Sequence, residues 1–330
     1  MGKVLVALAI GVFSWSVQAG ETRYPVNPAL SMGAIYVAGQ GVIRFDAGMR
    51  KPAWKALDGA QLHEPVADEG RVYVGGAGGL YGLDGQSGKE LWHLSVGSPV
   101  FSPVKSGNTI YLAGQDGVIR SVSARSGKVQ WSVKPGNGWI YPPVVSGGVL
   151  VTGGQDGTVW GLDAGTGAEL WAVQLSQELV YRPLLTNSRS VLVTTFGGDV
   201  ITLDLLSGNE RWRKHFPTPS MISSMTEQGV VLGSMGGFMR LLSTDSGEPL
   251  WQHSLGSRLV TPVSGRGGRL MAITEDGLYR HLDAATGVTL QQGKLEGDPL
   301  ATAYISDHQA IFFSQVRNNF RTASVSLGEN

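Results

Sequence analysis

The chain has 330 residues, with 26 Lys and Arg side chains balanced by 26 Asp and Glu side chains, 48 Gly and no Cys. With 42% hydrophobic and 16% charged residues it can bury a large core, which excludes a disordered or coiled-coil chain. The lack of Cys excludes disulfides, thiolate-bound metals and cysteine nucleophiles. The neutral charge balance argues against a nucleic-acid-binding protein.

The amino terminus has the pattern of a targeting segment. Lys3 precedes an apolar run that begins at Val4 and ends at Phe13, and small or medium residues follow up to Ala19. This order predicts a secretory signal peptide over residues 1–19, because the run is shorter than the roughly 20 residues that span a bilayer. We therefore expect a mature chain of residues 20–330 in the periplasm, without a lipid anchor because no Cys can carry one.

A repeat runs through the rest of the chain. Each copy has an apolar residue, then Asp or Ser, then a Ser/Thr-Gly pair three and four positions later, then Trp eight positions after the Asp or Ser. Successive Asp or Ser positions 84, 123, 163, 204, 243 and 283 differ by 39, 40, 41, 39 and 40. The repeat residues are Asp84, Asp163, Asp204 and Asp283; Gly88, Gly127, Gly167, Gly208, Gly247 and Gly287; and Trp54, Trp92, Trp131, Trp171, Trp212 and Trp251. A repeat of this period indicates an array of equivalent structural units.

Each copy predicts four short strands. Asp-Gly pairs at Asp116, Asp156 and Asp276 suit two-residue hairpins between the second and third strands, and the repeat Gly suits a left-handed position in the next turn. The Trp strand is expected to be outermost, with its ring packed between units. Four-stranded units at this period are typical of a β-propeller.

The sequence therefore predicts an all-β chain with one domain, residues 20–330, folded as a propeller of eight four-stranded blades; seven blades are the alternative. An eighth copy has three expected strands, residues 301–305, 310–315 and 320–325, and lacks the fourth. Residues 21–24 stand where that strand is needed, so we expect the amino terminus to complete the last blade.

The residues from Gly157 to Trp171, with the sequence GTVWGLDAGTGAELW, resemble the repeat of pyrroloquinoline quinone-like propellers, and so do residues 80–92. The resemblance implies one of two classes, a quinoprotein dehydrogenase or a non-catalytic scaffold similar to the outer-membrane assembly factors of the BamB type. Quinoprotein alcohol dehydrogenases are about twice as long and commonly have an adjacent Cys pair, which this chain lacks. BamB-type proteins normally carry a lipid on an N-terminal Cys, which is also missing here.

Other motifs favour no chemistry. The repeat carboxylates occupy structural turns, and the six His residues are at least 27 positions apart in sequence. We therefore expect no catalytic residues, no metal site and no cofactor.

The connections between a Trp strand and the next repeat are the remaining candidates for binding. Three of them, residues 134–142, 174–182 and 215–221, contain aromatic, Arg, Met and aliphatic side chains, several of which are enriched at protein interfaces. The candidate partner-binding residues are Trp139, Ile140, Tyr141, Leu179, Tyr181, Arg182, Phe216 and Met221. In BamB-type proteins the loops on one face bind periplasmic domains of the barrel-assembly protein. The resemblance thus implies a periplasmic scaffold with protein partners in outer-membrane assembly; the alternatives are a scaffold of another envelope complex and a small-ligand or quinone-binding protein.

Overall fold

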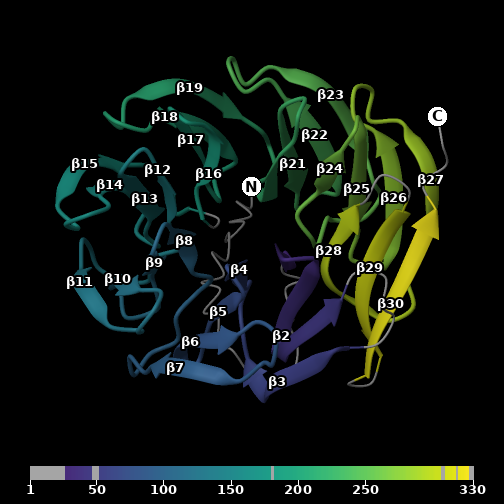
Figure 1. Cartoon of the computed structure of the whole chain (residues 1–330). Helices are drawn as coiled ribbons and strands as arrows, with labels where there is room; N and C mark the ends of the chain where they lie inside the picture. Colours follow the sequence, from purple (N-terminus) through teal and green to yellow (C-terminus); the bar gives the residue numbers. More distant parts are fainter. Residues whose placement is uncertain (1–26, 47–51, 180–181, 306–308, 317–318, 327–330) are drawn as a thin grey trace, which may run out of the picture.

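The computed structural model describes residues 27–46, 52–179, 182–305, 309–316 and 319–326. All regular elements in this part of the chain are β-strands, arranged in antiparallel sheets that follow one another along the sequence. Figure 1 shows the sheets in a ring, with the first strand of each sheet toward the centre and the last at the rim. Inner strands of several neighbouring sheets contact one another, as β1 contacts β4 and β16 contacts β20, and β2 contacts β28 where the ring closes.

Six sheets of the described chain have four strands each. They are β4 (Val66–Asp68), β5 (Arg71–Gly76), β6 (Gly79–Asp84) and β7 (Glu90–Leu94); β8 (Val104–Ser106), β9 (Thr109–Leu112), β10 (Ile119–Ser123) and β11 (Val129–Val133); β12 (Val144–Ser146), β13 (Val149–Gly153), β14 (Thr158–Asp163) and β15 (Glu169–Gln174); β16 (Leu184–Asn187), β17 (Ser190–Thr194), β18 (Asp199–Asp204) and β19 (Glu210–His215); β20 (Ser220–Met225), β21 (Val230–Ser234), β22 (Phe238–Leu242) and β23 (Pro249–Ser254); β24 (Ser264–Arg266), β25 (Arg269–Ile273), β26 (Leu278–Asp283) and β27 (Thr289–Lys294).

Two further sheets have three strands each: β1 (Ala29–Ser31), β2 (Ala34–Asp46) and β3 (Trp54–Gln61); and β28 (Asp298–Ile305), β29 (Gln309–Val316) and β30 (Asn319–Ser326). The all-β propeller with four-stranded blades is confirmed. Eight complete four-stranded blades are not confirmed, because these two sheets have three strands among the described residues. The expected closing segment, residues 21–24, lies outside the described residues, as does the expected signal peptide.

The hydrophobic core lies between neighbouring sheets. Val151 and Val159 of the β12–β15 sheet belong to one buried cluster with Val191 and Val193 of the β16–β19 sheet. Each sheet thus buries its two faces against its neighbours, which is how a propeller removes apolar surface from water. No helix in the described ranges is long and apolar enough to cross a membrane.

The repeat tryptophans join each sheet to the next. The indole N–H of Trp131 donates to the carbonyl of Ala164 at 3.2 Å, and that of Trp171 donates to the carbonyl of Leu205 at 3.1 Å. Each acceptor directly follows the repeat Asp of the next sheet, and the other repeat tryptophans make the equivalent bond. The expected packing of Trp between units is confirmed.

The repeat Asp side chains hold the turns before the Trp strands, as predicted. Asp163 Oδ1 accepts the backbone N–H of Thr166 at 2.8 Å and its hydroxyl at 2.7 Å. Gly167, in the same turn, has a φ of +77°, the left-handed conformation that favours glycine. Hydrogen bonds from Thr166 lower the pKa of Asp163, because they favour the charged carboxylate.

Asp204 holds the equivalent turn of the next sheet and gives the stability of the protein a testable dependence on pH. A hydrogen bond from Arg211, at 2.5 Å, and further bonds from Ser207 lower the pKa of Asp204 to about 2. A carboxyl whose pKa is lower in the folded state contributes stability above its unfolded pKa and loses it as the pH falls. We expect the Tm difference between the native chain and Asp204→Asn to shrink as the pH falls from about 4 to about 2, measured by thermal unfolding at each pH. Two curves that stay parallel across this window would contradict the assignment.

Candidate partner interface

One end of the ring collects the connections in which partner-binding residues were predicted. Strands alternate in direction, so the turn between the second and third strands of a sheet lies at the same end as the connection that leaves its fourth strand. We call this end the connection face. Backbone hydrogen bonds tie each connection to such a turn. The N–H of Gln155 donates to the carbonyl of Trp139 at 3.0 Å, and that of Phe196 donates to Glu178 at 3.0 Å.

The prediction that Ile140 and Leu179 bind a partner is wrong. Ile140 and Leu179 are fully buried, each in a hydrophobic cluster between sheets. Each also forms an isolated β-bridge, with Gly154 and Thr195 respectively. The residue at this point of a connection anchors the loop in the core, so it cannot contact a partner.

Trp139 and Tyr141 lie on either side of buried Ile140 and are half-buried. Both rings approach Phe101 of the preceding connection, with centroids at 6.5 Å for Trp139 and 6.4 Å for Tyr141. The His63 ring meets Phe101 edge-on at 5.6 Å. We call these four residues the aromatic cluster; they come from three successive connections of the ring.

A salt bridge joins Glu64, which follows His63 of the aromatic cluster, to Arg182 in a connection farther around the ring. Arg182 Nη1 lies 2.8 Å from Glu64 Oε2, and the two partly exposed residues are 118 positions apart in sequence. Glu64 lies in the connection before β4 and Arg182 in the connection before β16, so the pair joins two connections that are separated around the ring by the β4–β7, β8–β11 and β12–β15 sheets. Arg182 therefore lies on the connection face, and its role in partner binding stays a prediction. Tyr181 lies outside the described residues.

Burial lowers the pKa of His63 to about 4, because desolvation disfavours the charged imidazolium. His63 is then neutral at neutral pH, and the unfolded chain binds a proton that the folded chain does not between about pH 6.5 and 4. Stability should fall as the pH drops through this window. Thermal unfolding of the native chain and His63→Gln from pH 7 to 4 tests this. The native chain should lose more stability than the variant, and equal losses would contradict a neutral His63 with a lowered pKa.

Phe216 lies in the connection between β19 and β20, Met221 is the second residue of β20, and both are half-buried. The Phe216 ring packs on the guanidinium of Arg240, with Cζ 4.6 Å from the ring centroid. Arg240 is buried, and its Nε donates to Gln252 at 2.6 Å. Burial lowers the pKa of Arg240. Phe216 therefore contributes to packing between sheets, and no contact places it in the aromatic cluster.

Two exposed apolar residues on the connection face were missed by the sequence analysis. Phe196 is 37% exposed and Met235 is 51% exposed, each in the turn between the second and third strands of its sheet. Gln115, Gln155 and Glu275 occupy the equivalent position in other sheets. A large apolar residue at a turn position that is polar in three other sheets was the available signal.

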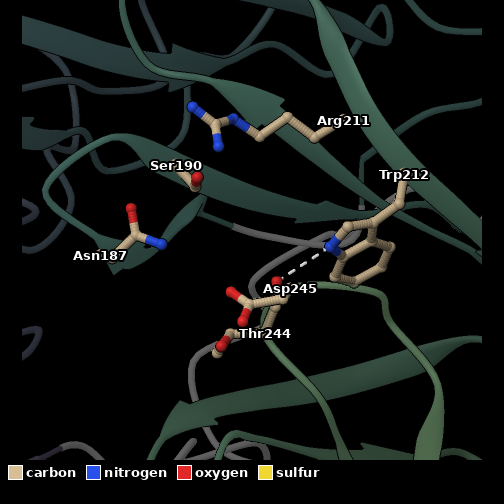
Figure 2. Close-up of a pocket in the computed structure, with 6 residues that line it drawn as sticks. All are labelled: Asn187, Ser190, Arg211, Trp212, Thr244 and Asp245. Carbon is tan, nitrogen blue, oxygen red and sulfur yellow. Dashed lines mark hydrogen bonds between the residues drawn. The ribbon is translucent and has the colours of Figure 1, made fainter.

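The opposite end of the ring has a shallow polar cavity of about 310 Å³, shown in Figure 2. Its lining residues are Asn187, Ser190, Arg211, Trp212, Thr244 and Asp245. The Trp212 indole already donates to the carbonyl of Thr244 at 2.9 Å, and Arg211 pairs with Asp204. These groups maintain the joint between two sheets. In the described ranges no cluster of His, Asp or Glu has the arrangement of a metal site.

The repeat and the ring define the class of the protein: it is a propeller built from repeats of the pyrroloquinoline quinone-like type. A family model described as "Outer membrane protein assembly factor BamB" matches residues 15–138, 115–228 and 198–317. These matches together span most of the sequence, and the chain belongs to this family.

One curated relative is the outer membrane protein assembly factor BamB of Burkholderia pseudomallei (strain K96243), which is 31% identical over 126 residues. That match covers 36% of this chain and about a third of the relative (33%).

Solved structures share the fold. BamB from Moraxella catarrhalis has a TM-score of 0.75 at 17% identity, with 92% of this chain and 97% of that chain covered. The computationally designed Ika8 protein has a TM-score of 0.81 at 16% identity, with 93% and 98% covered. Sqt1 of Saccharomyces cerevisiae has a TM-score of 0.76 at 13% identity, with 93% and 97% covered. At these identities the likeness shows the fold alone.

Proposed function

We propose that the chain is a non-catalytic scaffold of the cell envelope, which binds protein partners through the connection face during assembly of outer-membrane β-barrel proteins. Membership of the BamB family supports the role. The observation that carries the proposed site is the aromatic cluster beside the Arg182–Glu64 pair. Trp, Tyr and Arg are enriched among the few residues that dominate the binding energy at protein interfaces.

The arrangement suits protein recognition better than chemistry. The rings of Trp139 and Tyr141 are fixed by Phe101, and the Tyr141 carbonyl accepts the Thr152 hydroxyl at 2.6 Å. Rings held in place before binding lose little conformational entropy when a partner covers them. Arg182 and Glu64 neutralise each other's charge in the free protein. A partner that contacts this region therefore needs either a largely apolar surface or a charged group that takes the place of one of the two, an acidic group in place of Glu64 or a basic group in place of Arg182.

The decisive experiment is affinity capture of the outer-membrane barrel-assembly protein by the full chain in envelope extracts, with Trp139→Ala and the matched control Leu250→Ala. Leu250 is exposed on the outer strand β23, away from the connections. We expect Trp139→Ala to weaken binding at least tenfold, a loss of about 1.4 kcal/mol, as for a binding hot spot. Leu250→Ala should bind like the native chain.

Two results would overturn the proposal. One is native-strength binding by a folded Trp139→Ala variant, which would remove the connection face from the interface. The other is a purified chain without assembly partners that carries a stoichiometric quinone chromophore in its absorbance spectrum, which would favour the quinoprotein class.

A further inference from the structure

Arg240 is a buried cation without an acidic partner. The residue is 4% exposed, and its Nε donates to Gln252 at 2.6 Å. Its Cζ lies 4.6 Å from the ring centroid of Phe216 and 5.5 Å from that of Phe238. Its Nη1 is buried and has no hydrogen-bond partner among the residues that the structure describes. A buried charge without a paired charge carries a large free-energy cost, so its presence needs an explanation.

Two other sheets have an arginine at the same repeat position, and there a carboxylate accompanies it. Arg120 lies four positions after Asp116, and its Nη2 is 2.5 Å from Oδ2 of Asp116. Arg280 lies four positions after Asp276. A hydrogen bond from Thr274 and, to a lesser extent, the charge of Arg280 lower the pKa of Asp276. Both carboxylates belong to the turn between the second and third strands of their sheets.

The corresponding turn of the β20–β23 sheet lacks this carboxylate, because Gly236 stands four positions before Arg240. Gly236 is exposed, and its φ is outside the left-handed region. A Cβ there would meet Thr218 Cγ2 at 3.4 Å and Phe238 Cδ2 at 3.6 Å, which are ordinary van der Waals contacts. The fold therefore has room for a side chain at this position, and it is the sequence that omits the acid.

We propose that Arg240 receives a carboxylate from a bound protein partner, which takes the place of the turn Asp of the other two sheets. Gly236 lies in a turn on the connection face and Phe216 in a connection on the same face, so the site is continuous with the proposed interface. Met235, next to Gly236, is 51% exposed. The partner segment should therefore present an acidic group beside apolar residues. This inference rests on the proposed function, because it specifies the chemistry of the partner.

A side-chain movement is enough to open the guanidinium to the partner. Phe216 and Phe238, whose rings contact the guanidinium, are only half-buried, and Phe216 lies outside the strands. Rotation of the Phe216 ring would expose Nη1 to a carboxylate that arrives at the connection face. The resulting hydrogen bonds join two charged groups, which makes them roughly twice as strong as bonds between neutral groups.

The first test needs no partner. Gly236→Asp restores the turn carboxylate, and Gly236→Asn supplies an uncharged side chain of nearly the same shape. At pH 7 the Tm of Gly236→Asp should exceed that of Gly236→Asn by about 2–4 °C, and the difference should vanish in an Arg240→Gln background. Equal Tm values for the two Gly236 variants, or a difference that persists without the guanidinium, would show that Arg240 accepts no carboxylate and would overturn the proposal.

The second test measures capture of the barrel-assembly protein by the same full-length variants. Gly236→Asp should bind at least tenfold more weakly than Gly236→Asn, because its own carboxylate already pairs with the guanidinium. Arg240→Gln should also weaken binding, whereas Leu250→Ala should not. Native capture that is equal for the two Gly236 variants would refute this inference and leave the proposed function intact. A native chain that captures no partner would refute both.

A free carboxylate is the other source of the same chemistry. Replacement of sodium chloride by sodium acetate at equal concentration should change the Tm of the native chain and of Gly236→Asp equally, because a small ion lacks the apolar contacts that displace the Phe216 ring. A rise in Tm with acetate that occurs in the native chain and not in Gly236→Asp would assign the site to a small ligand and contradict its assignment to a partner.

Discussion

Replacement of Trp171 by Ala is expected to lower the free energy of unfolding by about 3–5 kcal/mol. Trp171 is 8% exposed and belongs to the largest buried cluster between the β12–β15 and β16–β19 sheets. Its indole also donates to the carbonyl of Leu205 in the next sheet. Truncation to Ala therefore removes a large apolar surface and one hydrogen bond at the same joint. Urea unfolding of the two proteins, followed by circular dichroism, gives the difference.

A matched variant separates the two contributions. Trp171→Phe keeps an aromatic ring in the cluster and removes the N–H, so it should cost less than Trp171→Ala. Leu170→Ala, at the exposed neighbouring position of β15, should change the unfolding free energy little. A loss below about 1 kcal/mol for Trp171→Ala would contradict a role of the repeat Trp in joining sheets.

The repeat chemistry was predictable from sequence because it is local. The Asp-to-Trp spacing within one copy determined the turn, the outer strand and the left-handed Gly, and each was found where the pattern placed it, as in Asp163, Gly167 and Trp171. Local patterns of this kind recur in successive units, so the structure assigned to one copy of the repeat can be tested against the other copies. The number of complete sheets was less predictable, because strands at the ends of the chain have no second copy beside them.

The candidate interface was only partly predictable, because neighbours along a connection have opposite environments. Trp139 and Ile140 are adjacent, yet the first belongs to the aromatic cluster and the second is buried between sheets. The salt bridge of Arg182 with Glu64 joins residues from different sheets, and no spacing in the sequence signals it. Contacts of this kind depend on how the ring brings distant connections together.

Replacement of Gly208 by Ala is the second change with a large expected effect. Gly208 has a φ of +72°, and a Cβ there would lie 2.7 Å from Cδ2 of Trp171. The left-handed conformation costs a non-glycine residue about 1–2 kcal/mol. The contact with a packed indole ring adds a further cost of about 1–3 kcal/mol, because the ring cannot move without disturbing the cluster.

Gly268 provides the control for this prediction, because its φ is also +72° and a Cβ there would meet nothing within 4 Å. Gly268→Ala should therefore show the conformational cost alone, and the excess of Gly208→Ala over Gly268→Ala should report the contact with Trp171. In a Trp171→Ala background this excess should vanish, since the ring that the Cβ meets is gone. Urea unfolding of the single and double variants measures the cycle. If the excess persists without the indole, the repeat Gly is required for the turn alone and the close packing of Trp on Gly does not contribute to the joint.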